Sequence, residues 1–282
     1  MSLVTTRELV VNAAAARRAV PAFNVITLEY AEAVTAGAAA AGIPVILQIS
    51  ENAVRFHGGR VEPIARAAAE AARACDIDVA LHLDHVTDTG LLHRAADAGF
   101  SSAMFDAGAL PYAENLAATA AATRWAHGAG LWLEAELGYV GGKPGAPASA
   151  HAAGVRTDPA EAARYVADTG VDALAVAVGS SHAMTERSAT LDDALIARLR
   201  DAVPVPLVLH GSSGVGDDGL RRAVAAGIAK VNIGTALGVA FTRAVREALA
   251  AAPGAADPRP YLARGREAVA ETVRHWCTVV SG

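Results

Sequence analysis

Three of the nine histidines come shortly after aliphatic runs that are typical of buried strands. His85 follows VALHLD, His182 follows ALAVAVGSS, and His210 follows PLVL. Three neutral imidazoles with an open fourth position are the ligands of a catalytic divalent ion such as zinc. The three are too far apart in the chain to form a local motif. They can hold a metal only if the fold brings the ends of their strands together.

Carboxylates, like these histidines, stand at the ends of the aliphatic runs. Asp84 directly precedes His85, where a bound cation would keep it ionised until a substrate hydroxyl offers a proton. Asp84 is therefore predicted to act as a general base or acid, and the alternative is an acceptor that orients a ligand imidazole. Asp106 and Glu136 also end aliphatic runs. We expect them to be associated with the metal, either at a second or displaced metal position or as charge balance.

Two short turns, 211–214 (GSSG) and 232–235 (NIGT), consist of small and polar residues and open into predicted helices. Backbone N–H groups at helix starts collect anions, so the two turns together indicate a phosphorylated substrate. Asn24 and Ser50 end two further strands and are predicted to join the same substrate site. The predicted substrate residues of the two turns are Gly211, Ser212, Ser213, Asn232, Ile233, Gly234 and Thr235.

These side chains are carried by a regular alternation of strand and helix patterns. Continuous aliphatic runs separated by alanine-rich helical stretches predict an α/β fold with a parallel sheet buried on both faces. Eight such units favour a closed (β/α)8 TIM barrel, with a doubly wound open sheet as the alternative. We expect one domain over residues 1–282, with a C-terminal helical extension from about 255. The predicted strands are 20–25, 44–49, 78–83, 102–105, 131–136, 172–178, 206–209 and 229–233.

Composition excludes several classes of protein. The 282 residues carry 24 Lys and Arg against 29 Asp and Glu, a net charge of −5, and contain no basic run, so nucleic acid is not an expected partner. No charge-free apolar window of about 18 residues occurs, so no membrane span is expected. Cys75 and Cys277 are far apart and no secretory leader pattern opens the chain, which predicts a cytoplasmic location.

Motifs along nearly the whole chain resemble one family, the class II, metal-dependent ketose-bisphosphate aldolases, and in particular its tagatose-bisphosphate-like branch. The LDH triplet, the HG that follows strand seven and the KVN stretch are specific to it. The matching segments are VPAFNV (20–25), LHLDH (81–85), SAMFD (102–106), EAELG (134–138), TGVDALAVAVGSSH (169–182), PLVLHGSSG (206–214), KVNIGT (230–235) and DPRPYL (257–262).

The resemblance implies one Zn²⁺ per subunit on His85, His182 and His210, with a possible second metal position. It also implies proton transfer by Asp84 and binding of dihydroxyacetone phosphate by the two turns. The implied activity is reversible cleavage of tagatose or fructose 1,6-bisphosphate, in carbohydrate metabolism such as glycolysis, by a homodimer or homotetramer. Arg259 resembles an arginine that reaches the phosphate of a neighbouring subunit.

The sequence departs from the family's pattern at two places. Ala183 stands where the family usually has a glycine whose backbone meets the substrate, although an alanine still offers its N–H. The loop 141–154 contains no carboxylate and has Lys143, Pro144 and Gly145 where acidic residues are expected. His151 or a water on the metal could carry the proton instead, the natural substrate could differ, or proton exchange could be slow.

Other readings remain open. A Schiff-base aldolase needs an amine in the barrel mouth, and the chain has only Lys143 and Lys230, the second expected to have its side chain at the wrong end of the barrel. The substrate could be another phosphorylated keto-sugar or keto-acid, and a non-catalytic sugar-phosphate-binding barrel is the alternative outside enzymes. No residue distinguishes tagatose from fructose, and three imidazoles also accept cobalt, iron or manganese.

Overall fold

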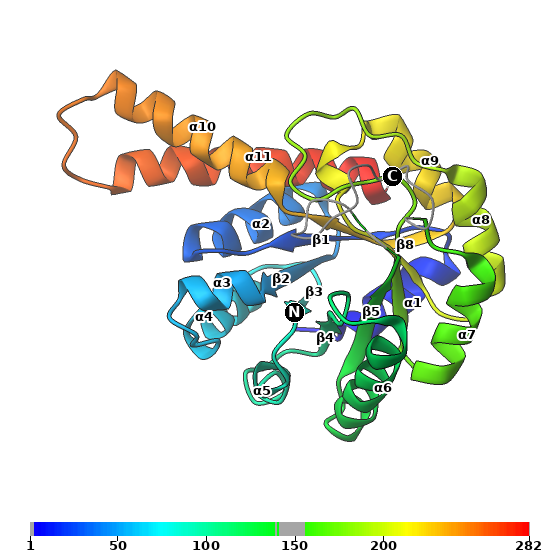
Figure 1. The fold of residues 1–282 in the computed structure, drawn as a ribbon. Helices are drawn as coiled ribbons and strands as arrows, with labels where there is room; N and C mark the ends of the chain where they lie inside the picture. The colour runs from blue at the N-terminus through cyan, green and yellow to red at the C-terminus, as the bar shows by residue number, and fades with distance from the viewer. Residues whose placement is uncertain (1–2, 139, 141–155, 282) are drawn as a thin grey trace.

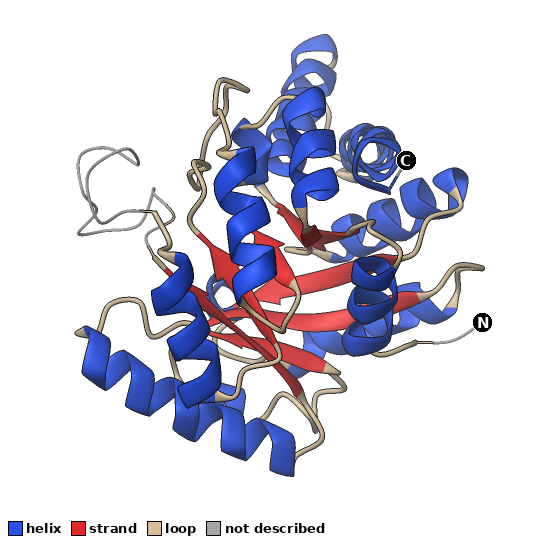
Figure 2. Ribbon diagram, turned by 90° about the vertical axis from the view of Figure 1, so that its right-hand side faces the viewer, coloured by secondary structure: helices blue, strands red, loops and turns tan. Residues whose placement is uncertain are grey.

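The computed structural model describes residues 3–138, 140 and 156–281, whose strands form a closed barrel of parallel neighbours in sequence order (Figure 1). Helices surround the strands on all sides (Figure 2). The predicted (β/α)8 barrel is confirmed, and the doubly wound alternative is wrong because β1 pairs with β8 and closes the sheet. The strands are β1 Val20–Asn24, β2 Val45–Ser50, β3 Val79–Val86, β4 Ser102–Phe105, β5 Trp132–Leu137, β6 Ala173–Val176, β7 Leu207–Leu209 and β8 Ile228–Ile233.

Five of the helices in the described part of the chain begin at a residue whose side chain caps them. Side-chain oxygens of Thr5, Ser50, Asp88, Asp158 and Asp192 accept hydrogen bonds from backbone N–H groups of the first turn, which have no partner within a helix. The helices are α1 Thr6–Ala15, α2 Leu28–Ala41, α3 Glu51–Phe56, α4 Glu62–Arg73, α5 Thr89–Leu92, α6 Tyr112–Gly128, α7 Pro159–Thr169, α8 Asp193–Ala202, α9 Asp217–Ala226, α10 Thr235–Ala251 and α11 Arg259–Ser281.

Apolar residues fill two layers. The larger lies between the strands and the surrounding helices. The smaller fills the barrel interior with small side chains such as Ala22 and Ala80 together with Trp132. Leu9 and Val10 of α1, a helix that the sequence pattern did not predict, belong to this inner cluster and close one end of the barrel. The rest of the interior is polar, and this polar layer carries the candidate site.

The C-terminal part of the chain forms a helical hairpin of α10 and α11 that projects from the barrel (Figure 1). Helix α11 packs back along α10 and against α2. Helix α11 begins at Arg259 and ends at Ser281. Among the described residues, no helix has both the length and the apolar character that a membrane span requires.

Candidate metal centre and active site

The barrel brings the three predicted metal ligands together. His85 lies near the end of β3, His182 in the connection after β6, and His210 directly after β7. One ring nitrogen from each lies within 4.8 Å of the others. The ring centroids are 5.0 Å apart for His85 and His210, 5.2 Å for His85 and His182, and 5.7 Å for His182 and His210. This spacing allows a single divalent ion to be held by all three rings.

An irregularity in β3 presents Asp84 and His85 to the same pocket. Side chains normally alternate between the two faces of a strand, so neighbours point in opposite directions. Here the pairing of β3 with β4 shifts between Leu83 and Val86, and His85 has a left-handed backbone with φ of 51°. Such a conformation costs a non-glycine residue about 1–2 kcal/mol. The bulge therefore stores strain at the point where it places two functional side chains side by side.

Carboxylates surround the predicted ligands. Asp106 Oδ2 lies 2.9 Å from His85 Nδ1, which leaves the other ring nitrogen, Nε2, for a metal. His210 is buried between Glu136 Oε2, 2.9 Å from Nδ1, and Glu134 Oε1, 2.9 Å from Nε2. Burial lowers the pKa of His210, but its hydrogen bonds with the two glutamates outweigh this and raise the pKa to about 9. The two glutamates therefore place negative charge around His210, and a bound ion would have to replace the extra proton on its ring.

Asp84 is buried beside this cluster, and its Oδ1 has no hydrogen-bond partner among the described residues. Burial by itself raises the pKa of the Asp84 carboxyl group. The nearby His85 and His82 lower it by more than burial raises it, so the pKa lies below its ordinary value. The group is therefore ionised with an oxygen available, which are the two properties that proton abstraction needs.

The two predicted phosphate turns are tied to each other. Ser212 Oγ donates to the carbonyl of Asn232, and Ser213 Oγ accepts from Ala236 N at 3.1 Å. Gly211 has a left-handed backbone with φ of 66°, and a Cβ there would lie 2.6 Å from the carbonyl oxygen of Ser181. Helix α10 begins after Gly234, which supplies no side-chain cap, and the N–H of Ala236 in its first turn donates to Ser213 Oγ. The start of this helix therefore lies against both turns, where an anion would be favoured.

Two other predicted substrate residues lie on neighbouring strands. Asn24 accepts a hydrogen bond from Gln48, and a Cβ on Gly234 would lie 3.1 Å from Asn24 Cγ, which places β1 against the second turn. Ser50 Oγ accepts from Ala53 N at 3.2 Å and so caps α3. Ile233 is buried in β8, and Thr235 is the first residue of α10.

Ala183 and Arg259 have very different positions. Ala183 follows His182 and has φ of 59°, a conformation that glycine adopts without strain. Arg259 begins α11 at the tip of the projecting hairpin, where its side chain is 88% exposed and its Nη2 lies 2.7 Å from Asp257 Oδ2 (Figure 1). The structure therefore does not bring Arg259 to the histidines of its own chain. Loop residues Lys143, Pro144, Gly145 and His151 lie outside the described residues.

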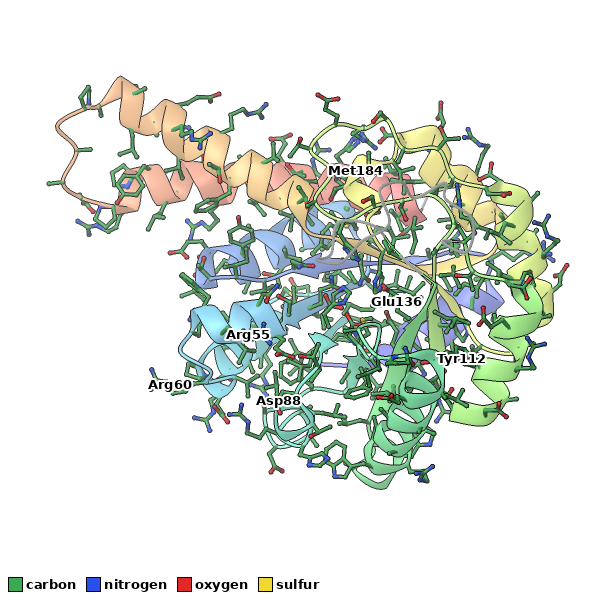
Figure 3. The ribbon with its side chains drawn as sticks, in the orientation of Figure 1. Arg55, Arg60, Asp88, Tyr112, Glu136 and Met184 are labelled. Carbon is green, nitrogen blue, oxygen red and sulfur yellow. The ribbon has the colours of Figure 1, made fainter. Side chains whose placement is uncertain are left out.

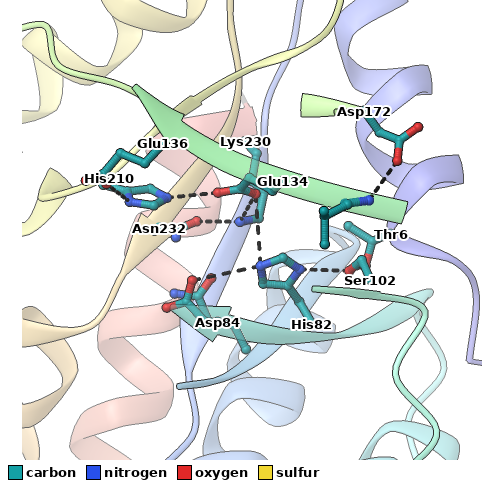
Figure 4. A network of polar contacts seen from close by, with 12 residues as sticks. Thr6, His82, Asp84, Ser102, Glu134, Glu136, Asp172, His210, Lys230 and Asn232 are labelled. Atoms are coloured by element: carbon teal, nitrogen blue, oxygen red, sulfur yellow. Dashed lines mark hydrogen bonds and ion pairs between the residues drawn. The ribbon is translucent and has the colours of Figure 1, made fainter. Parts of the chain in front are cut away.

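The expectation that Lys230 has its side chain at the wrong end of the barrel is wrong. Its side chain is completely buried, and Nζ lies 2.8 Å from Glu134 Oε2 and 2.8 Å from Asn232 Oδ1 (Figure 4). A lysine side chain is long enough to reach the site from a strand residue two positions before Asn232. Burial raises the pKa of Glu134, but Lys230 and the hydrogen bond with His210 bring it below its ordinary value.

Two further polar residues complete the interior. Gln48 is buried beside Asn24, and its Oε1 has no hydrogen-bond partner in the described part of the chain. His82 is fully buried, with its Nδ1 2.7 Å from Ser102 Oγ. Gln48 could have been found from the sequence, since it faces inward by strand alternation. In Figure 3, Glu136 lies near the centre of the barrel, whereas Arg60 lies at its periphery.

Comparison with known proteins agrees with this geometry. The family model of class-II fructose-bisphosphate aldolases matches residues 4–282. A fructose-bisphosphate aldolase from Geobacillus stearothermophilus is 38% identical over 275 residues, which cover 97% of this chain and 95% of the relative. The chain therefore belongs to the class-II fructose-bisphosphate aldolase family. It is an aldolase, a lyase that acts on a carbon–carbon bond, as the resemblance of its motifs implied.

Solved structures show the same fold. The crystal structure of the YdjI aldolase from Escherichia coli has a TM-score of 0.85 and 33% identity, covering 99% of this chain and 97% of that one. A fructose-bisphosphate aldolase from Campylobacter jejuni has a TM-score of 0.82 at 24% identity, covering 99% of this chain and 95% of the other. The second likeness concerns the fold alone.

Proposed function

We propose that this chain is a metal-dependent aldolase that reversibly cleaves a ketose 1,6-bisphosphate, fructose or tagatose, to dihydroxyacetone phosphate and glyceraldehyde 3-phosphate. The observation that carries the proposal is the convergence of His85, His182 and His210 within 4.8 Å beside the buried carboxylate of Asp84. The name of the Geobacillus stearothermophilus relative supports a ketose bisphosphate as substrate.

The three histidines would hold the ion, and the fit is chemical as well as spatial. Three imidazoles suit zinc, with cobalt, iron or manganese as alternatives. Asp106 and Glu136 each lie 2.9 Å from a ring nitrogen of a ligand and would orient the rings. When bound, the ion supplies Lewis acidity to the substrate carbonyl. In this arrangement Asp106 and Glu136 orient the ligand imidazoles. The alternative is that the two carboxylates hold a second metal ion.

Asp84 would take the proton of the C4 hydroxyl in the cleavage direction. Its Oδ1 is buried without a partner in the described residues, so a substrate hydroxyl is a suitable donor. As the proton leaves, C4 becomes the aldehyde carbon of glyceraldehyde 3-phosphate and the C3–C4 bond breaks. Its electron pair remains on the C3 side, which must take up a proton to give dihydroxyacetone phosphate. The group that supplies this proton is open, since His151 and the loop 141–154 lie outside the described residues.

The turns 211–214 and 232–235 would bind the phosphate of the dihydroxyacetone half. The start of α10, which lies against the turn 211–214 through the Ala236–Ser213 hydrogen bond, and the left-handed backbone at Gly211 suit an anion. Asn24, Ser50 and the N–H of Ala183 would contact the rest of the substrate. Arg259 would act at the site of a neighbouring subunit in a homodimer or homotetramer, and a cytoplasmic location stays a prediction of the sequence.

The test is cleavage of both 1,6-bisphosphates with and without a chelator, followed by addition of zinc. Cleavage that is lost with the chelator and restored by zinc supports the proposal and identifies the preferred epimer. The matched variant is Asp84→Asn, which should retain zinc and bind dihydroxyacetone phosphate but cleave neither sugar. A zinc-loaded protein that binds the phosphate without cleaving any bisphosphate would favour the non-catalytic barrel or another phosphorylated keto-sugar or keto-acid.

A Schiff-base mechanism has little support from the geometry around Lys230. Its Nζ is buried and lies 2.8 Å from the carboxylate of Glu134, which stabilises the charged ammonium form. An ammonium has no lone pair and cannot attack a carbonyl. Borohydride added with substrate should therefore leave the mass of the protein unchanged. A stable increase in mass that maps to Lys230 would contradict this.

A further inference from the structure

Lys230 connects two parts of the site that the reaction uses. It is one of the largest fully buried side chains, and its Nζ lies 2.8 Å from Glu134 Oε2 and 2.8 Å from Asn232 Oδ1 (Figure 4). The other oxygen of Glu134, Oε1, lies 2.9 Å from Nε2 of His210. One ammonium therefore contacts both a residue of the second phosphate turn and a carboxylate beside a predicted metal ligand.

The charge of Lys230 determines how the Asn232 side chain must be oriented. An ammonium can only donate hydrogen bonds, whereas the two ends of a carboxamide differ, because oxygen accepts and nitrogen donates. Asn232 must therefore turn Oδ1 toward Lys230, and its Nδ2 then points away from it. Asn232 is 8% exposed, and its Nδ2 has no hydrogen-bond partner among the described residues. A buried donor without a partner is costly unless a ligand satisfies it.

We propose that Lys230 is a positioning residue, which fixes the Asn232 amide so that Nδ2 donates to an oxygen of the phosphorylated substrate. The inference rests on the proposed function, since it assumes that Asn232 contacts that substrate. Lys230 itself contacts neither the substrate nor the reacting atoms. Glu134 pairs with Lys230 and allows its charge to remain buried, so that the orientation of Asn232 is held in the absence of substrate.

Removal of Lys230 alone would leave the Glu134 carboxylate buried without its cation, and such a variant can lose its fold. The experiment therefore replaces both members of the ion pair together, as Glu134→Gln/Lys230→Met, so that no buried charge is left unpaired. This paired change, Asn232→Leu and the two combined form a double-mutant cycle with the wild type. Each protein is loaded with zinc, and its affinity for dihydroxyacetone phosphate is measured by titration calorimetry, with unfolding followed in parallel.

We expect Glu134→Gln/Lys230→Met and Asn232→Leu each to weaken binding of dihydroxyacetone phosphate about tenfold, the loss of one hydrogen bond of about 1.4 kcal/mol. Both together should lose no more than either alone, because Lys230 acts through Asn232. A purely structural role would lower thermal stability without this non-additivity. Losses that multiply to about a hundredfold, or an unchanged affinity in Glu134→Gln/Lys230→Met, would overturn the proposal.

A second measurement does not depend on whether the lysine variants fold. Protein labelled with ¹⁵N-asparagine reports the Asn232 side-chain amide, which is assigned by its loss in Asn232→Leu. Addition of dihydroxyacetone phosphate should shift this signal, and an unchanged signal at saturation would overturn the proposal. If the protein cleaves a bisphosphate but the cycle is additive, only the role of Lys230 fails. If it binds dihydroxyacetone phosphate without cleavage and the cycle is non-additive, only the proposed reaction fails.

Discussion

The buried imidazole of His82 should make the metal-free protein sensitive to acid. Its Nδ1 lies 2.7 Å from Ser102 Oγ, and its Nε2 has no hydrogen-bond partner among the described residues. Burial, followed by the nearby positive charge of Lys230, lowers the pKa of His82 to about 3. In the unfolded chain a histidine has a pKa of about 6.5, so between these values the unfolded state binds the extra proton. The free energy of unfolding must therefore fall as pH decreases through 6.5 toward 3.

The size of the effect follows from the two pKa values. From pH 8 to pH 5, His82 should remove about 2 kcal/mol from the free energy of unfolding. His82→Gln removes the titrating group and retains an amide that can reach Ser102. Urea unfolding of both proteins at pH 8 and pH 5, with a chelator present, should show a loss about 2 kcal/mol larger in the wild type than in the variant.

The difference in this stability loss between the wild type and His82→Gln isolates the contribution of His82, because the other acid-sensitive groups titrate in both proteins. The matched control is His93→Gln, since His93 is exposed and packs on the ring of Trp125. This variant should keep the pH dependence of the wild type. The reasoning would be refuted if His82→Gln and the wild type lost the same stability between pH 8 and pH 5.

Three further outcomes are expected. Ala183→Gly should raise the free energy of unfolding by about 1 kcal/mol in urea, because Ala183 has φ of 59°, and a lower stability would contradict this. Gly211→Ala should lower the free energy of unfolding by about 2 kcal/mol or more and weaken binding of inorganic phosphate, because the new Cβ would lie 2.6 Å from the Ser181 carbonyl oxygen. A variant as stable as the wild type would argue against this close approach of the turn to Ser181. Zinc at about 100 times its Kd should stabilise the protein by about 2.7 kcal/mol in thermal or urea unfolding, and His182→Ala should abolish this gain; equal stabilisation of the variant would exclude His182 as a ligand.

Much of the architecture could be predicted from local patterns. The eight aliphatic runs coincide with the strands of the barrel to within a few residues, because strands buried on both faces need continuous apolar sequences. The largest difference is at β3, predicted to end at residue 83 and observed to continue to Val86. The polar Asp84 and His85 interrupt the apolar pattern, although the backbone continues as a strand through the bulge. Helix α1 was missed because its apolar residues pack into the end of a closed barrel, which no local pattern reveals.

The types of residue at the site were evident from the sequence, while their relations were decided by the tertiary structure. Strand ends and turn composition identified His85, His182, His210 and Asp84, since these side chains carry recognisable chemistry wherever they occur. The left-handed backbone at His85 and the contact of Lys230 with Asn232 depend on strands that are far apart in the chain and meet only when the barrel closes. Burial and distance determine which of these groups is charged and which atom faces the substrate, and both arise from packing between elements rather than from any segment alone.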